Sequence, residues 1–180
     1  AVNITSDYPE LNKLINDMWE TMYNANGVGI AAPQIGKSIR LFVIDASPFS
    51  EEKEISDDEI SILKNFKKVF INPEIIDETG DERNFIEGCL SIPNIREDIK
   101  RKEKITIKYY NEFFEQIELD LEGLAARVVQ HEYDHIEGVL FIDKLSSLKK
   151  KLLKGKLNDI SKGKIKTEYK MRYPQGKIKR

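Results

Sequence analysis

The stretch HEYDH, residues 131–135, decides how this 180-residue chain folds and what chemistry it can perform. On a helix, side chains at i and i+4 lie on one face about a turn apart, so His131 and His135 can bind one metal ion. Glu132 stands where metallohydrolases with an H-E-x-x-H segment carry a general base. The alternative is a pair of structural histidines that fall at this spacing by chance.

The residues before the motif continue its helical periodicity. Leu124 and Val128 precede His131 at spacings of four and three, on the face that carries both histidines. We therefore predict a helix from Glu122 to about Glu137 whose ligand-bearing face is directed at the core, so that the metal is buried.

A third protein ligand is needed, because catalytic divalent metals usually have three protein ligands and one water. Downstream of residue 137 the acidic residues are Asp143, Asp159 and Glu168, and no helical pattern around them favours a ligand. Upstream lies EGCLS, residues 87–91, where glycine allows close backbone approach and the thiol of Cys89 can ionise beside a metal. Cys89 completes a set of three ligands, and a buried, inert thiol is the alternative.

The segment GVGIAAPQ, residues 27–34, consists of small and apolar residues and ends in an amide. It does not match a dinucleotide-binding fingerprint, because it follows a helical pattern rather than a strand and lacks a third glycine. Its small residues indicate that something approaches the backbone closely. Gln34 is either a hydrogen-bond donor to a ligand or an ordinary turn residue.

The rest of the pattern predicts a helix, then strands, then a second helix, which is the order of an α+β domain. The first helix is expected from Tyr8 to about Ala25, with a capping box formed by Asp7 and Glu10. An exposed acidic segment is expected at Ser50–Glu59. β-branched and alternating residues predict strands at Arg40–Asp45 and Val69–Ile76, and a hairpin of Lys104–Tyr110 with Phe113–Leu121.

Composition favours a single globular domain, since 180 residues can bury a core and 33% of them are charged. Apolar stretches such as Leu41–Ile44 are far shorter than the roughly 20 residues of a membrane-spanning helix. No signal or transit pattern begins the chain, and its single cysteine allows no internal disulfide, so we expect a cytoplasmic location. Residues 144–180 contain 14 Lys or Arg and two acids, a charge of +12 in a chain of net charge −2. We expect a short helix after Ser146, followed by a loosely held basic tail.

Together the three segments resemble the peptide deformylases. That family carries G-x-G-x-A-A-x-Q, E-G-C-L-S and Q-H-E-x-D-H in this order, and residues 27–34, 87–91 and 130–135 match without a changed residue. The resemblance extends from about Tyr8 to Leu145. Family members usually begin with a further segment that includes a G-x-P-x-L-R-like turn, and this chain starts after it, so we expect a trimmed N-terminus.

The resemblance implies an α+β fold in which small antiparallel β-sheets surround a central metal-binding helix. We expect residues 1–147 to form the catalytic domain, and residues 148–180 to be a basic C-terminal helix and tail of the same domain. The implied activity is hydrolytic removal of the N-formyl group from the N-terminal formylmethionine of nascent proteins, with release of formate.

The resemblance also assigns a metal and its ligands. Cys89, His131 and His135 would hold one divalent metal, Fe(II) in the cell, with zinc, nickel or cobalt possible in purified protein. Metal-bound hydroxide would attack the formyl carbon, with Glu132 as general base and then general acid.

Further residues receive substrate-facing roles from the same resemblance. The amide of Gln34 and the backbone N–H of Leu90 would stabilise the oxyanion. Backbone contacts to the peptide would come from Gly29, Glu87 and Gly88. The candidates for the methionine pocket are apolar residues beside the motifs, namely Val28, Ile86, Leu124 and Val128.

We expect a monomer that acts on N-formylmethionyl peptides, with no DNA or membrane partner. The basic tail either contacts ribosomal RNA transiently or is a solvated appendage. One of Arg96 and Arg101 is expected to pair with Asp134 or Glu87 beneath the site, and two solvated arginines are the alternative.

Two other functions remain open. A zinc endopeptidase shares H-E-x-x-H, but would need a downstream ligand and would not need Cys89. A non-catalytic protein with a structural metal would normally need four protein ligands.

Overall fold

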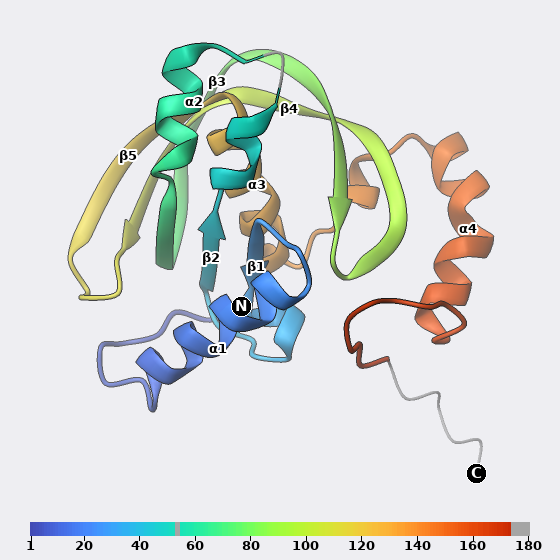
Figure 1. The fold of residues 1–180 in the computed structure, drawn as a ribbon, viewed down its shortest axis with the longest axis horizontal. Helices are drawn as coiled ribbons and strands as arrows, with labels where there is room; N and C mark the ends of the chain where they lie inside the picture. The colour runs from blue at the N-terminus through green and yellow to red at the C-terminus, as the bar shows by residue number, and fades with distance from the viewer. Residues whose placement is uncertain (53–54, 174–180) are drawn as a thin grey trace.

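The computed structural model describes residues 1–52 and 55–173, and in these ranges one five-stranded antiparallel sheet curves around a central helix (Figure 1). The helices are α1 (Leu11–Asn24), α2 (Asp57–Lys64), α3 (Gly123–Glu137) and α4 (Ser147–Ser161). Short 3-10 helices span Ala32–Ile35, Ser47–Glu51 and Phe141–Lys144. The strands, in the order in which they pair, are β1 (Gly29–Ala31), β2 (Leu41–Asp45), β3 (Lys67–Cys89), β4 (Ile92–Tyr110) and β5 (Gln116–Glu122). The α+β prediction is confirmed, with the strands joined in one sheet rather than in several small ones.

Strands β3 and β4 form a long curved ribbon that returns to α3 (Figure 1). The sequence predicted only residues 69–76 of β3, but the pairing of β3 with β4 continues through the charge-rich stretch 77–83 to Cys89. Four register shifts interrupt this pairing. Such bulges bend a strand and increase its twist, so the far end of β3 reaches the helix at the centre of the fold.

Helix α3 is confirmed as the central element. Ala125 and Ala126 are buried against the sheet, where their small size allows close packing. Gly138, with φ of +77°, ends the helix in the left-handed conformation that favours glycine. At the other end, the Glu59 carboxylate of α2 accepts a 2.7 Å hydrogen bond from the backbone N–H of Leu124. An acid at the positive end of the helix dipole stabilises α3 in its place.

Helices α1 and α4, at the outside of the fold, each pack against the rest of the protein through one apolar face. Helix α1 buries Leu11, Ile15, Met18 and Met22 against β1 and β2, as its helical spacing predicts. Helix α4 buries Leu153 and Ile160 in a separate cluster with residues of β4 and of the 3-10 helix that follows α3. In the described ranges, none of the helices has the length and apolar character that crossing a bilayer requires.

One local prediction is wrong, and a second is incomplete. Glu10 takes the left-handed conformation, with φ of 54°, and within the described residues no side-chain hydrogen bond caps α1. The carboxylate of Asp7 instead accepts from the hydroxyl of Thr5. The described residues of the acidic segment at 50–59 are exposed or half-buried, as predicted, but part of the segment is helical, because Ser56 caps α2 by accepting from the backbone N–H of Glu59. Residues 53–54 of that segment, and residues 174–180 of the predicted basic tail, lie outside the described residues.

Candidate metal centre

The three ligands expected from the sequence, Cys89, His131 and His135, lie together beside α3. Cys89 is the last residue of β3, and the two histidines lie about one turn apart on α3. Their ligand atoms all lie within 4.8 Å of one another, and Cys89 Sγ is 3.2 Å from His135 Nε2. One sulfur and two imidazole nitrogens at these separations fit a single divalent ion that has three protein ligands. The chain therefore contains a possible metal site.

The surroundings of His131 stabilise positive charge, whereas those of His135 favour the neutral ring. Nδ1 of His131 lies 2.9 Å from Oε2 of Glu87, a carboxylate–histidine contact of the kind that orients metal ligands. Burial lowers the pKa of His131, but its interactions with Cys89 and Glu87 outweigh burial and raise the pKa from 6.5 to about 10. Burial and the charge of His131 lower the pKa of His135 to about 3, so that imidazole is neutral, as a metal ligand must be.

Glu87 lies at the centre of a buried ion-pair network beneath the site. Its carboxylate accepts hydrogen bonds of 2.7 and 2.9 Å from Arg101, which also donates to Asp134 at 2.7 Å. The prediction that Arg96 or Arg101 pairs with Glu87 or Asp134 is therefore confirmed, through Arg101. Burial raises the pKa of Glu87, but hydrogen bonds from His131 and Arg101 outweigh burial and lower the pKa overall from 4.5 to about 2.

Arg127 is a member of this network that sequence reasoning missed. Its Nη1 donates to Glu87 at 3.0 Å and to the carbonyl oxygen of Ile99 at 2.9 Å. Arg127 lies four residues before His131 on α3, and this spacing, which places both on one face of the helix, could have indicated from the sequence that Arg127 lies near the ligands. Arg96 is exposed, and its side chain packs beside Gly88 instead.

Glu132 is buried next to the three ligands. Its Oε2 has no hydrogen-bond partner in the described part of the chain. Burial raises the pKa of Glu132 from 4.5 to about 7. A Cβ at Gly29 would lie 2.5 Å from Glu132 Oε1, so the backbone of β1 can approach this carboxylate only because residue 29 is glycine. A buried carboxylate oxygen without a partner, adjacent to a possible metal site, could exchange a proton with a bound water or substrate.

Gln34 presents its amide nitrogen to the same site. Its Oε1 accepts a 2.8 Å hydrogen bond from the backbone N–H of Ala31, and this leaves Nε2 directed at the loop that follows β3. Nε2 lies 3.1 Å from Ser91 Oγ and 3.7 Å from Cys89 Sγ. Gln34 therefore makes specific contacts beside the site. Leu90, the other predicted oxyanion donor, lies in sequence between Cys89 and Ser91, the two residues that Gln34 Nε2 contacts.

A cavity of about 1520 Å³ lies over the possible metal site. Its lining includes most of the substrate-facing residues expected from the sequence, namely Val28, Gly29, Ile86, Glu87, Gly88 and Val128. Leu124 is not in the cavity lining within the described ranges; it is packed in the core between α3 and the sheet. Ile86 is 61% exposed.

Part of the lining was not foreseen. Phe49, from the 3-10 helix that follows β2, and residues 166–169, from the basic C-terminal stretch, also face the cavity. Nothing in the charge pattern of that stretch distinguishes it from a solvated tail.

A sequence model of the family described as "Polypeptide deformylase" matches residues 1–151 of this chain. The chain belongs to the peptide deformylase family. It is 59% identical to a peptide deformylase of Christiangramia forsetii over 98% of this chain and 90% of that protein. A peptide deformylase of Flavobacterium johnsoniae is 55% identical over 97% of this chain and 89% of its own length. The crystal structure of a peptide deformylase from Legionella pneumophila is 41% identical, with a TM-score of 0.73 over 91% of this chain and 88% of that one.

Proposed function

We propose that this peptide deformylase relative hydrolyses the N-formyl group of N-terminal formylmethionine in nascent proteins and releases formate. The observation that carries the proposal is the buried, unpartnered carboxylate of Glu132 beside the cluster of Cys89, His131 and His135. The cavity over that cluster is large enough to admit a peptide end. Family membership supports the same chemistry.

We infer that Cys89, His131 and His135 hold one divalent metal ion, Fe(II) in the cell and zinc, nickel or cobalt in some purified preparations. A thiolate with two imidazoles suits each of these ions. Such an ion supplies a Lewis acid for the formyl carbonyl and lowers the pKa of a water molecule toward neutrality. A thiolate in this position is open to oxidation, so we expect activity of the iron form to be lost in air.

The protein groups then have separate tasks. Glu132 accepts a proton from the attacking water and delivers one to the methionine nitrogen as the C–N bond breaks. Nε2 of Gln34 and the backbone N–H of Leu90 donate hydrogen bonds to the oxyanion of the tetrahedral intermediate. In typical hydrolases the loss of one such donor costs about 3 to 4 kcal/mol of transition-state stabilisation.

The cavity lining suggests how the substrate is held. The backbones of Gly29 and of residues 87–88 are placed to hydrogen-bond the peptide. Val28 and Val128 are apolar lining residues suited to the methionine side chain, with Ile86 at the exposed rim. Leu124 acts on this pocket only through packing behind it, because it is buried in the core.

The direct test is formate release from formyl-Met-Ala-Ser by protein loaded with Fe(II) in the absence of oxygen. We expect formate and free Met-Ala-Ser in equal amounts, and no turnover of acetyl-Met-Ala-Ser. Cys89→Ser should lose both the bound metal and the activity. Cleavage of internal bonds in an unformylated peptide, retained by Cys89→Ser, would instead favour a zinc endopeptidase.

We propose that the protein acts as a cytoplasmic monomer near the ribosome, and that the basic C-terminal stretch contacts ribosomal RNA through phosphates. Deletion of α4 would uncover the apolar cluster that it packs against, so substitution of exposed lysines is the cleaner test. Lys151, Lys154 and Lys156 are exposed on α4. Their joint replacement by Gln should weaken ribosome co-sedimentation at low salt and leave peptide turnover unchanged. Equal ribosome binding by the variant would reject the RNA contact.

A further inference from the structure

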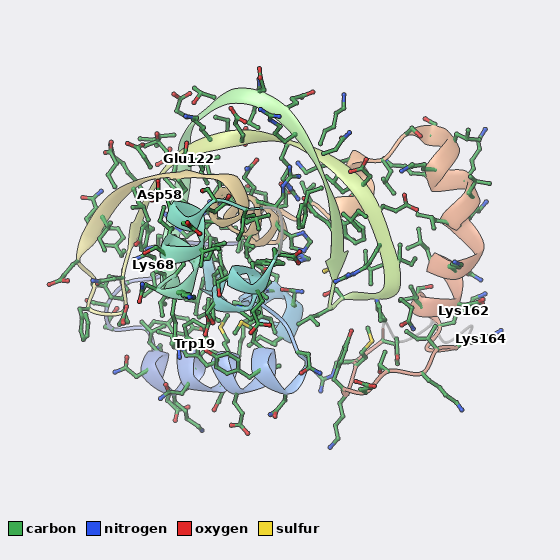
Figure 2. The ribbon with its side chains drawn as sticks, turned by 45° about the horizontal axis from the view of Figure 1, so that its top comes forward. Trp19, Asp58, Lys68, Glu122, Lys162 and Lys164 are labelled. Atoms are coloured by element: carbon green, nitrogen blue, oxygen red, sulfur yellow. The ribbon has the colours of Figure 1, made fainter. Side chains whose placement is uncertain are left out.

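The chain after α4 folds back toward the metal site instead of leaving the protein. We call residues 164–173 the C-terminal segment. The turn that begins it is made at Gly163, whose φ is +68°, and a Cβ at this position would lie only 3.0 Å from the ring of Tyr173. Ile165 then packs against the apolar cluster shared by β4 and α4. Figure 1 shows the segment passing beneath the turn between β3 and β4, and Figure 2 marks Lys162 and Lys164 where it leaves the helix.

Tyr169 joins this segment to the loop that carries the predicted oxyanion donor. Its hydroxyl donates a 2.8 Å hydrogen bond to the backbone carbonyl oxygen of Leu90, 79 positions away in sequence. The Tyr169 backbone is itself held, because Thr167 Oγ1 donates to its carbonyl oxygen at 2.7 Å. Both residues line the cavity over the possible metal site, together with Cys89 and Leu90.

The hydrogen bond from Tyr169 holds a backbone turn that lies beside the possible metal site. Leu90 and Ser91 form the two-residue turn between β3 and β4, outside the ladder that fixes the neighbouring peptides. The Leu90 carbonyl and the Leu90 N–H lie in adjacent peptide planes that meet at the Leu90 Cα. Because the pairing of Cys89 with Ile92 closes this short turn, a donor that holds the plane of the carbonyl also limits how far the plane of the N–H can rotate. A restraint of this kind preorganises a hydrogen-bond donor before the transition state forms.

We propose that Tyr169 is a positioning residue that holds the Leu90 backbone so that its N–H faces the reacting carbonyl. This proposal rests on the proposed function, since the N–H matters for rate only if an oxyanion forms there. It assigns a role in the reaction to a segment that lies beyond the matched family region, which ends at residue 151.

The test compares Tyr169→Phe with Tyr173→Phe in the full-length, metal-loaded protein. Tyr169→Phe keeps the aromatic ring and removes only the hydroxyl, so we expect kcat for formyl-Met-Ala-Ser to fall about three- to tenfold with KM unchanged. Tyr173→Phe, in the same segment but outside the cavity lining of the described residues, should match the wild type. A role limited to packing or to substrate binding would change KM or stability instead, and that result would overturn the proposal.

A second measurement does not depend on turnover. Amide hydrogen exchange of the peptide that contains residues 89–92 should be faster in Tyr169→Phe than in the wild type and in Tyr173→Phe. Unchanged exchange would overturn the proposal even if the protein is an active deformylase. Absence of formate release by the wild type, with faster exchange in Tyr169→Phe, would refute the proposed function and the effect of Tyr169 on its rate, while the restraint of Leu90 by Tyr169 would stand.

Discussion

Replacement of Arg101 by Met tests the buried network beneath the possible metal site. The Arg101 side chain is 2% exposed and makes three hydrogen bonds, two to Glu87 and one to Asp134. Met fills a similar volume but leaves both carboxylates without their main partner. Removal of one member of a buried ion pair typically costs about 3 to 5 kcal/mol.

The two carboxylates keep other partners in Arg101→Met, so the expected decrease in the free energy of unfolding lies at the low end of that range. Glu87 keeps its 3.0 Å contact with Arg127, and Asp134 keeps a 3.2 Å contact with Lys144. We therefore expect a decrease of about 3 kcal/mol in the free energy of unfolding. For a chain of this length, that corresponds to a decrease in Tm of about 6 to 12 °C.

The assay is chemical and thermal unfolding of the metal-free protein, followed by metal titration. Metal-free conditions matter because a bound ion adds its own stabilisation to the folded state. Arg83→Met is the matched control, since Arg83 is 67% exposed in its ion pair with Glu103 and its loss should cost less than about 1 kcal/mol. Since Glu87 orients His131, metal affinity of Arg101→Met should also fall about 10- to 100-fold. An Arg101→Met protein as stable as the Arg83→Met control would refute this reasoning.

Two further predictions concern separate parts of the molecule. Gly29→Ala places a Cβ where the Glu132 side chain now lies, so kcat for the formylated peptide should fall about 100-fold. Metal content, measured on the same sample, should stay unchanged. Loss of the metal would contradict the assigned contact between Gly29 and Glu132. Burial raises the pKa of Asp45, but hydrogen bonds from Ser47 and Tyr23 lower it overall from its ordinary value of 3.8. A carboxyl group whose pKa is lower in the folded state stabilises the protein at pH values above its unfolded-state pKa, and this stabilisation is lost as pH falls through the folded-state pKa. The stability advantage of wild type over Asp45→Asn, measured by urea unfolding, should therefore shrink below about pH 4.

The site could be predicted from the sequence largely because its signals are local. The two histidines lie on one helix, at a spacing that fixes their common face, and a single cysteine left one thiol to complete the ligand set. Arg101 could be predicted as a partner because it follows Cys89 closely in the chain. Arg127 was missed because its contact with Glu87 depends on how α3 packs against β3, across 40 residues of sequence.

Most of what the sequence did not predict depends on tertiary contacts. The middle of β3 is charged and exposed, so it has no alternation that would mark it as a strand, and it is held in place by pairing with β4. Asp7 and Glu10 match a capping-box pattern, yet the left-handed conformation of Glu10 and the Thr5–Asp7 hydrogen bond replace that cap. Tyr169 lies in a lysine-rich stretch whose composition favours solvent, and only the docked segment brings it to Leu90.

Glu132→Gln provides the most direct test of the central claim, that a single metal ion and one buried carboxylate perform the hydrolysis. The amide has the shape of the carboxylate but cannot accept the proton of the attacking water. Metal content and formate release should be measured on the same anaerobic, iron-loaded samples of variant and wild type. We predict about one metal ion per chain in both proteins and formate release in the wild type alone. A metal-loaded Glu132→Gln protein that deformylates at a rate near that of the wild type would contradict the account.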